Sequence, residues 1–168
     1  MFSSGDLIMY GNTGVCKVVG TAMRSFSSDV QKKLYYELEP VYQGGVIYTP
    51  AENPTVFMRP VITEGEAREL IDMIPSIQAE AYHSRALNDL SGHYGAKIQT
   101  HDCRDLVELT MSIYEKKRAA AKQKRKVGAV DERFMKRAEE LLFGELAAAL
   151  CIPRTDVQKF IAARLQQA

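Results

Sequence analysis

The sequence predicts an α+β protein in which a small, strongly bent β-sheet or barrel comes first and a compact all-α domain of four or five helices follows. Three observations lead to this fold class. Up to residue 62, short apolar runs alternate with polar residues and end in turns rich in Gly and Pro. From Thr63 the apolar residues recur at helical spacing instead. The chain has 168 residues, 46% hydrophobic and 26% charged, a balance typical of a folded chain with one or two domains.

Five short strands are expected in the first part of the chain. In the third, Leu34, Tyr36 and Leu38 fall on one face, while Glu37 and Glu39 fall on the other. So many strands in so short a segment suit a bent sheet or barrel of the SH3/Tudor kind, because closing a sheet limits its exposed edges. One edge would still be available for pairing with a partner. The strands are expected at residues 7–10, 15–19, 34–39, 46–49 and 56–59.

The helical part is expected to begin at a capping box formed by Thr63 and Glu66, which places a domain boundary near residue 62. Gly128 is expected to break a helix, and Pro153 suits the first turn of another. The two predicted domains are therefore residues 1–62 and 63–168. Three apolar stripes carry the helical spacing: Leu106, Leu109 and Ile113; Phe134, Ala138, Leu141, Leu142 and Ala149; and Val157, Phe160, Ile161 and Leu165.

The net charge of +1 conceals one basic block. Residues 104–137 hold eleven basic and five acidic side chains, and the run 116–126 holds seven cations and no anion. Such a run attracts phosphate chains because it displaces their counterions. A solvated helix end or loop would have the same composition, so the run alone leaves both interpretations open.

Enzymatic chemistry has little support in the sequence. His93, His101 and Cys103 lie near one another but form no zinc motif, and Cys16 lies inside an expected strand. We expect three glutamates to lie on the solvent-exposed face of an amphipathic helix: Glu139, Glu140 and Glu145. The sequence therefore predicts no enzyme, no metal and no cofactor.

No apolar run is long enough for a membrane span, and the first residues do not resemble a signal peptide. The three cysteines suit a reducing compartment. We therefore expect a cytoplasmic protein.

Tyr82 and Arg85 form a second candidate for contact with nucleic acid, at the expected start of a helix. An aromatic ring can stack on or wedge against unpaired bases, and a nearby Arg can hold a phosphate. A half-buried packing residue is the alternative interpretation of Tyr82.

With both domains laid out, the chain resembles the CarD/CdnL family of bacterial transcription regulators, whose N-terminal module also occurs in the transcription–repair coupling factor. The first motif is F-x-x-G-D-x-x-x-Y-x-x-x-G-V, which begins at Phe2. The other matching segments are Tyr35-Tyr36-Glu37-Leu38, Tyr48-Thr49-Pro50-Ala51-Glu52-Asn53, Met58-Arg59-Pro60 and the stretches 131–142 and 144–147.

The resemblance implies that the N-terminal domain, Tudor-like in this family, binds the β subunit of RNA polymerase by sheet-edge pairing. It implies that Arg24 and Tyr48 are interface residues, although some relatives have Arg at the position of Tyr48. Val46, Ile47 and Thr49 surround Tyr48 on the expected edge strand.

The same resemblance implies that the helical domain meets promoter DNA at the upstream edge of the transcription bubble and changes the lifetime of the open complex. Arg85 matches a cation beside the DNA. Tyr82 falls at or beside a position where many relatives have a Trp wedge, and this chain has no Trp. Lys122, Lys124, Arg125 and Lys126 would add phosphate contacts, which position DNA without reading its sequence.

Two other functions remain open at this point: an adaptor that binds polymerase without touching DNA, and a small-barrel protein that binds RNA. The free sheet edge would also allow a homodimer.

Overall fold

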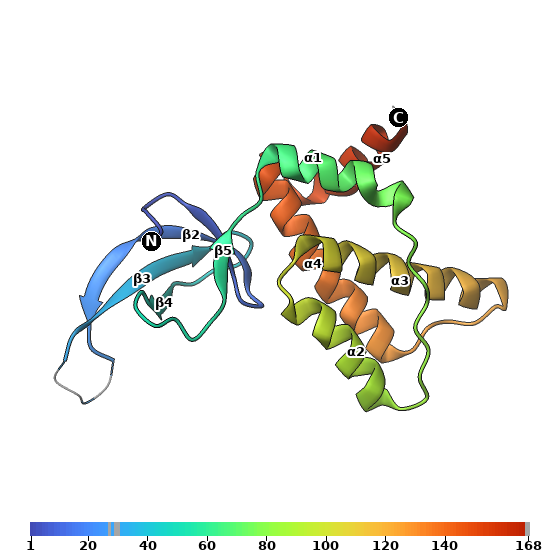
Figure 1. Ribbon diagram of the computed structural model, residues 1–168, viewed down its shortest axis with the longest axis horizontal. Helices are drawn as coiled ribbons and strands as arrows, with labels where there is room; N and C mark the ends of the chain where they lie inside the picture. Colours follow the sequence, from blue (N-terminus) through green and yellow to red (C-terminus); the bar gives the residue numbers. More distant parts are fainter. Residues whose placement is uncertain (27, 29–30, 167–168) are drawn as a thin grey trace. The chain divides into compact units, whose positions relative to one another are not determined.

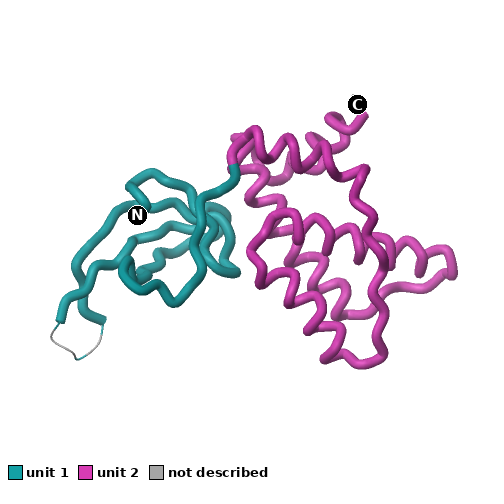
Figure 2. Tube along the Cα trace, in the orientation of Figure 1, with its two compact units in different colours: residues 1–62 teal, residues 63–168 magenta. Residues whose placement is uncertain are grey.

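The computed structural model describes residues 1–26, 28 and 31–166. The chain divides into two compact units, Met1–Ile62 and Thr63–Ala168 (Figure 2). The first unit carries the strands and the second the helices, so the predicted α+β class is confirmed.

The first unit is an open antiparallel sheet with the strand order β4-β3-β2-β1-β5 (Figure 1). Because β4 and β5 lie at opposite ends of this order, the sheet does not close into a barrel. Each of these two strands therefore has one neighbour among the described residues. The strands are β1 (Leu7–Tyr10), β2 (Gly14–Arg24), β3 (Lys33–Pro40), β4 (Ile47–Pro50) and β5 (Met58–Pro60).

Strand β2 is longer than the sequence predicts and runs on to Arg24. Its pairing with β3 shifts between Val18, opposite Leu38, and Gly20, opposite Glu37. This β-bulge exchanges the faces of the side chains that follow, so a simple alternation of apolar and polar residues stops at Val19. The predicted strand therefore ends there, although the observed strand continues.

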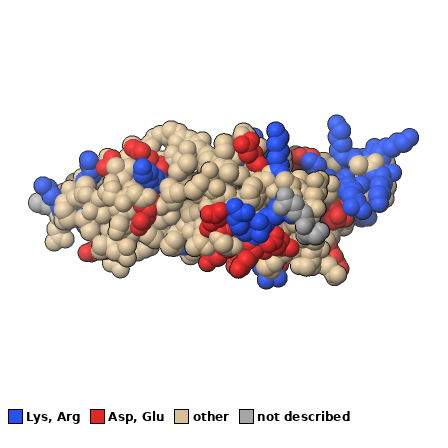
Figure 3. Space-filling view, turned by 90° about the horizontal axis from the view of Figure 1, so that it is seen from above, with Lys and Arg blue, Asp and Glu red and all other residues tan. Residues whose placement is uncertain are grey.

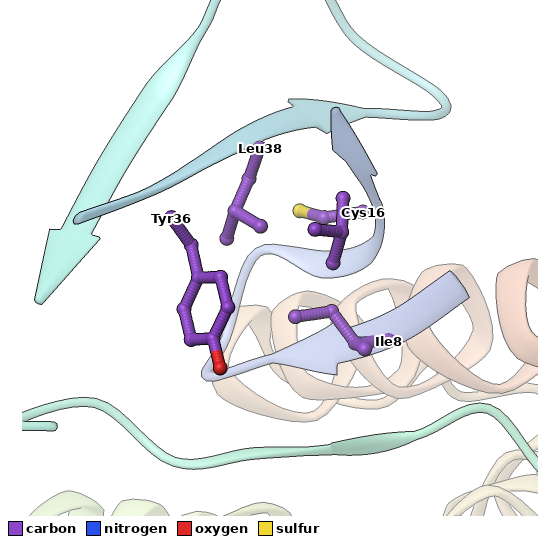
Figure 4. Close-up of a cluster of buried hydrophobic side chains, with 5 residues drawn as sticks. Ile8, Cys16, Tyr36 and Leu38 are labelled. Carbon is purple, nitrogen blue, oxygen red and sulfur yellow. The ribbon is translucent and has the colours of Figure 1, made fainter. Parts of the chain in front are cut away.

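The core of the sheet is a cluster of five buried side chains, Ile8, Cys16, Val18, Tyr36 and Leu38 (Figure 4). Phe2 packs against this cluster, and its backbone N–H donates a hydrogen bond to the Tyr36 hydroxyl oxygen at 3.1 Å. Tyr36 and Leu38 lie on the buried face as expected, while Glu39 is exposed. Burial raises the pKa of the Cys16 thiol to about 11, which keeps it protonated and inert.

The second unit begins at the predicted capping box. The Glu66 N–H donates to the Thr63 hydroxyl at 3.1 Å, and the Thr63 N–H donates to the Glu66 carboxylate at 2.9 Å. The five α-helices are α1 (Glu64–Met73), α2 (Leu87–Gln99), α3 (Cys103–Lys122), α4 (Ala129–Leu150) and α5 (Val157–Gln166), with 3-10 turns at Ile74–Ser76 and Arg154–Asp156.

Helix α4 is the central element of this unit, because it contacts α1, α2, α3 and α5. Gly128 caps its start, in agreement with the predicted break. The expectation that Glu145 lies on a solvent-exposed face is wrong, since its side chain is 0% exposed. A helix covered on several sides has no single solvent face, so the one-face pattern fails there, while Glu140 is exposed as predicted.

Within residues 1–26, 28 and 31–166, no helix combines the length and the apolar character needed to cross a membrane.

Candidate functional site

The structure brings Arg24 and Tyr48 together from two strands that are not neighbours. Arg24 is the last residue of β2 and Tyr48 lies in β4, with β3 between them. The guanidinium carbon of Arg24 lies 4.5 Å from the centroid of the Tyr48 ring. This is a cation–π contact, which orients the guanidinium without neutralising its charge.

The other predicted interface residues occupy the same edge but differ in exposure. Ile47 packs against the sheet core, and the Thr49 side chain is 1% exposed. Val46 is 48% exposed, and Tyr48 lies on the opposite face from Ile47 and Thr49. A partner could therefore meet the side chains of Val46 and Tyr48, but only the backbone of Thr49.

The free edge of β4 would serve strand addition. Among the described residues, β3 is the one strand paired with β4, through the register Glu37 opposite Tyr48 and Leu38 opposite Ile47. The other side of β4 carries backbone donors and acceptors with no second strand, which is the feature that sheet-edge pairing requires.

Phe26 belongs to this surface, although the sequence pattern did not predict it. Its ring lies edge-on to Tyr35 with centroids 4.9 Å apart, and it also contacts Tyr48 with centroids 5.5 Å apart. Even so, the side chain is 59% exposed. The only sign of Phe26 in the sequence is an isolated aromatic residue among small polar ones. A periodic pattern needs several residues, so it cannot predict the position of this single side chain.

Tyr82 lies in the irregular segment before α2, whereas the sequence pattern predicted it at the start of a helix. Its ring stacks on His93 with centroids 3.6 Å apart and an interplanar angle of 8°. Its hydroxyl donates a hydrogen bond to the Asp89 carboxylate at 2.6 Å. That bond raises the pKa of Tyr82 and lowers the pKa of Asp89, because it stabilises the phenol together with the carboxylate.

These contacts make Tyr82 a half-buried residue that is held in place, rather than a ring projecting freely into solvent. Arg85 lies in the same segment and is exposed. Ser112 ties this segment to α3, since its hydroxyl donates to the Glu80 carbonyl at 2.6 Å.

The basic run divides into a paired part and a free part. Lys116 binds the buried Asp131 at 2.9 Å, and its own side chain is 12% exposed. Lys117 pairs with Glu132 at 3.2 Å and Arg118 with Glu115 at 3.7 Å. These three cations serve the packing of the helices or have neutralising neighbours, so they contribute little to an outward positive field.

The free part is the cationic tip, which we define as Lys122, Lys124, Arg125 and Lys126. All four side chains are exposed, and none takes part in an ion pair between described residues. Figure 3 shows Lys and Arg side chains gathered at this end of the helical unit. The four cations are the ones that the sequence predicts for phosphate contact.

The backbone of the cationic tip has a defined geometry. The N–H of Arg125 donates to the Ala120 carbonyl at 2.8 Å, and the N–H of Lys124 donates to the Ala121 carbonyl at 3.0 Å. Together these bonds form a Schellman motif at the end of α3, with Lys124 at a φ of 56° in the position that Gly usually takes. The motif places the cations on a fixed turn at the end of a helix.

The cavities of the helical unit give less support for a binding site than the two surfaces described above. One has a volume of about 220 Å³ and is lined by His93, Lys97, Glu108 and neighbouring residues. Lys97 is already paired with Glu108 at 3.0 Å, so the cavity presents no free cation from that residue. Across the part of the chain that the structure describes, no group of three or more His, Cys, Asp or Glu residues is arranged to hold a metal ion.

Comparison with known proteins identifies the first unit. Residues 2–62 match the family model of the CarD-like/TRCF RID domain. No curated protein matches the chain. The sheet unit is therefore an RNA polymerase-interacting domain by class. More particularly, it is a CarD-like domain, and its position ahead of a helical unit is consistent with the CarD/CdnL family.

This assignment indicates the general role of the protein. A CarD-like domain suggests a transcription regulator that binds RNA polymerase. In standalone CarD proteins the domain family is regulatory rather than catalytic.

Proposed function

We propose that this protein binds the β subunit of RNA polymerase through the free edge of β4 and contacts promoter DNA through its helical unit, thereby changing the stability of the open complex. The observation that carries the proposal is the CarD-like domain over residues 2–62. Arg24, Val46, Ile47, Tyr48 and Thr49 would form the polymerase contact. The protein would then act in the cytoplasm, where bacterial polymerase works, and would need no cofactor.

The DNA contact is supported by the cationic tip, whose four side chains remain free of ion pairs with described residues. Four cations on one turn create a positive potential that favours a phosphate chain. No residue of the tip reads base edges in this proposal, so sequence specificity would come from the polymerase that delivers the protein to the promoter.

Tyr82 and Arg85 would contact the DNA near the melted bases. A regulator of this kind must bind one state of the initiation complex more tightly than another, because only a difference in affinity shifts an equilibrium. Stacking of Tyr82 on an unpaired base would supply such a difference, because duplex DNA presents no exposed base face.

The polymerase contact is tested with the full chain and a purified fragment of the β subunit that contains the lobe. Tyr48→Asp should abolish binding, because a charged residue on an edge strand opposes pairing with another strand. Val19→Asp is the matched control, since Val19 is a 38% exposed apolar residue away from β4. Equal binding of Tyr48→Asp and the wild type would contradict the polymerase contact.

The DNA contact is tested by the salt dependence of binding to promoter DNA. Replacing Lys124 and Lys126 by Gln should flatten the plot of log affinity against log salt by about 0.9 for each phosphate that the variant no longer neutralises. The matched control replaces Lys136 and Lys159, which are exposed cations of α4 and α5 outside the tip. An unchanged slope in the tip variant would exclude phosphate binding there.

Tyr82→Ala separates the proposed regulator from a polymerase-binding adaptor that leaves DNA alone. The specific observation in favour of the adaptor is that the Tyr82 ring and hydroxyl already have partners within the protein. A regulator that uses Tyr82 should lose its effect on open-complex lifetime in this variant, whereas an adaptor should keep it. Affinity for single-stranded RNA without polymerase would instead favour the RNA-binding alternative.

A further inference from the structure

Tyr114 is an aromatic side chain that the helical unit leaves largely in water. It is 58% exposed, and it makes no hydrogen bond or ring contact with another described residue. Every other Phe or Tyr ring of residues 63–166 is buried or half-buried. Tyr82, for example, already has His93 and Asp89 as partners. The Tyr114 ring is therefore available to a ligand that presents a flat face.

Tyr114 lies on the same face of α3 as the first cation of the tip. Arg118 and Lys122 follow it on that helix at i+4 and i+8, a spacing that aligns side chains along one face. Both cations are exposed, as is Ala121 beside them. Figure 1 shows this end of α3 projecting from the helical unit. We call Tyr114, Arg118 and Lys122 the outer ridge of α3; it leads from the aromatic ring to the cationic tip.

The outer ridge has the length and the composition that suit a nucleic-acid strand. The eight residues from Tyr114 to Lys122 span about 12 Å of helix. That length equals about three or four nucleotides at a rise of about 3.4 Å. Ala121 carries only a methyl group, so a strand can approach the helix closely there. Cations that hold phosphates beside a ring that stacks on a base are typical of surfaces that bind single strands.

Two carboxylates lie near the outer ridge, and each is already paired with a cation. Glu115 and Arg118 form an exposed i,i+3 pair at 3.7 Å, and Glu132 of α4 pairs with Lys117 at 3.2 Å. An exposed pair of this kind is weak. A phosphate offers the guanidinium of Arg118 two charged acceptors, which bind it more strongly than one distant carboxylate oxygen does. A phosphate chain should therefore displace Glu115 from Arg118.

We propose that the outer ridge of α3 binds an unpaired DNA strand, with one base stacked on Tyr114 and the phosphates leading from there to the cationic tip. This inference rests on the proposed function, because it takes the DNA contact of the helical unit as given. It adds a residue that stacks on a base and a path for the strand. In this arrangement Glu115 competes with the DNA for Arg118.

The test measures fluorescence anisotropy of a labelled single-stranded DNA of about 12 nucleotides as the full chain is added. Tyr114→Ala should weaken binding by about 10-fold, the effect expected when a stacking ring is removed. Tyr114→Phe keeps the ring and should bind within about 2-fold of the wild type. Phe57→Ala is the matched control, because Phe57 is a 45% exposed ring in the sheet unit. Circular dichroism at 222 nm verifies that each variant is folded.

Two further measurements separate stacking from charge. On a blunt duplex of the same sequence, Tyr114→Ala should bind within about 2-fold of the wild type, because paired bases present no free face. Glu115→Gln should bind the single strand about 2-fold more tightly than the wild type, because Arg118 loses its competing partner. Glu140→Gln is the matched control, since Glu140 forms the same i,i+3 pair with Arg137 on α4 at 3.8 Å, and it should raise the affinity less.

The outcomes distinguish the two proposals. If replacing Lys124 and Lys126 by Gln weakens DNA binding while Tyr114→Ala does not, the ring stacks on no base and the DNA contact of the tip stands. Equal weakening by Tyr114→Ala on single-stranded and duplex DNA also overturns the inference, as does a loss confined to single-stranded RNA. If the wild type binds no DNA even at about 50 mM salt, the proposed DNA contact fails together with the inference.

Discussion

Lys116 and Lys126 belong to the same run of cations, yet the fold gives them opposite environments. Lys116 is nearly buried and bonds to Asp131 at 2.9 Å. Asp131, which is 4% exposed, also accepts a hydrogen bond from the Tyr94 hydroxyl at 2.6 Å. Burial and this hydrogen bond raise the pKa of Tyr94, so its hydroxyl remains a donor. The three side chains join α2, α3 and α4 through one carboxylate.

We therefore predict that Asp131→Ala destabilises the helical unit by about 3 kcal/mol, because it leaves the Lys116 ammonium buried without its counter-charge. Urea unfolding followed by circular dichroism at 222 nm, which reports the helices, measures the change. Glu132→Ala is the control, since Glu132 is 54% exposed in its pair with Lys117. That variant should cost less than about 1 kcal/mol. Equal destabilisation by the two substitutions would contradict a structural role for the buried carboxylate.

Among the elements, helices α1 and α5 are joined by a two-bond clamp. Arg164 donates through Nε to Asp72 Oδ1 at 2.7 Å and through Nη2 to Asp72 Oδ2 at 2.9 Å. This clamp connects residues 92 positions apart in the chain, which no local pattern predicts. The hydrogen bond from Arg164 holds the pKa of Asp72 below its ordinary value.

The lowered pKa of Asp72 makes the clamp sensitive to acid. A carboxylate whose pKa is lower in the folded state stabilises that state above its unfolded pKa of about 3.9, and the stabilisation disappears as pH falls through the folded value. Asp72→Asn should therefore be less stable than the wild type at pH 7, and the difference should shrink as pH falls below about 4. Urea unfolding at a series of pH values measures this difference.

Glu69→Gln provides the control for the clamp, because Glu69 is an exposed carboxylate on the same helix. Its stability curve should stay parallel to that of the wild type through the acid range. A difference between Asp72→Asn and the wild type that is constant with pH would show that the carboxylate charge of Asp72 has no part in the clamp.

For the molecule as a whole, the proposed function depends on two weak contacts made by one chain. Phosphate contacts by four cations hold DNA loosely at physiological salt, but a protein already bound to polymerase meets the promoter at an effective concentration of about millimolar. The sheet unit would thus act as the anchor and the helical unit as the effector.

This division predicts different behaviour for variants of the two units. A tip variant with Lys124 and Lys126 replaced by Gln should bind polymerase normally yet lose most of its effect on open-complex lifetime at every protein concentration. Tyr48→Asp should lose the effect at low concentration and recover part of it at high concentration, because the helical unit can still meet DNA directly. The lifetime of the open complex, measured against protein concentration, gives one curve for the tip variant and one for Tyr48→Asp. Identical curves would rule out separate roles for the sheet unit and the helical unit.

Several features were accessible from the sequence because they depend on neighbouring residues. The Thr63–Glu66 capping box, the break at Gly128 and the buried face of β3 follow from local hydrogen bonding and from side-chain periodicity. The motif that begins at Phe2 led to the CarD-like domain, which the family model matches over residues 2–62. The basic run was also visible as composition.

Tertiary packing selects which members of those patterns are available for function. It separates Lys116, buried against Asp131, from the exposed cationic tip, and it places Tyr82 on His93 instead of at the start of a helix. It also brings Phe26 against Tyr35 and Tyr48. The elements and the class of the first domain could therefore be predicted from the chain alone, since these depend on local spacing. Exposure and pairing could not, because both depend on atoms that the fold brings together from distant positions.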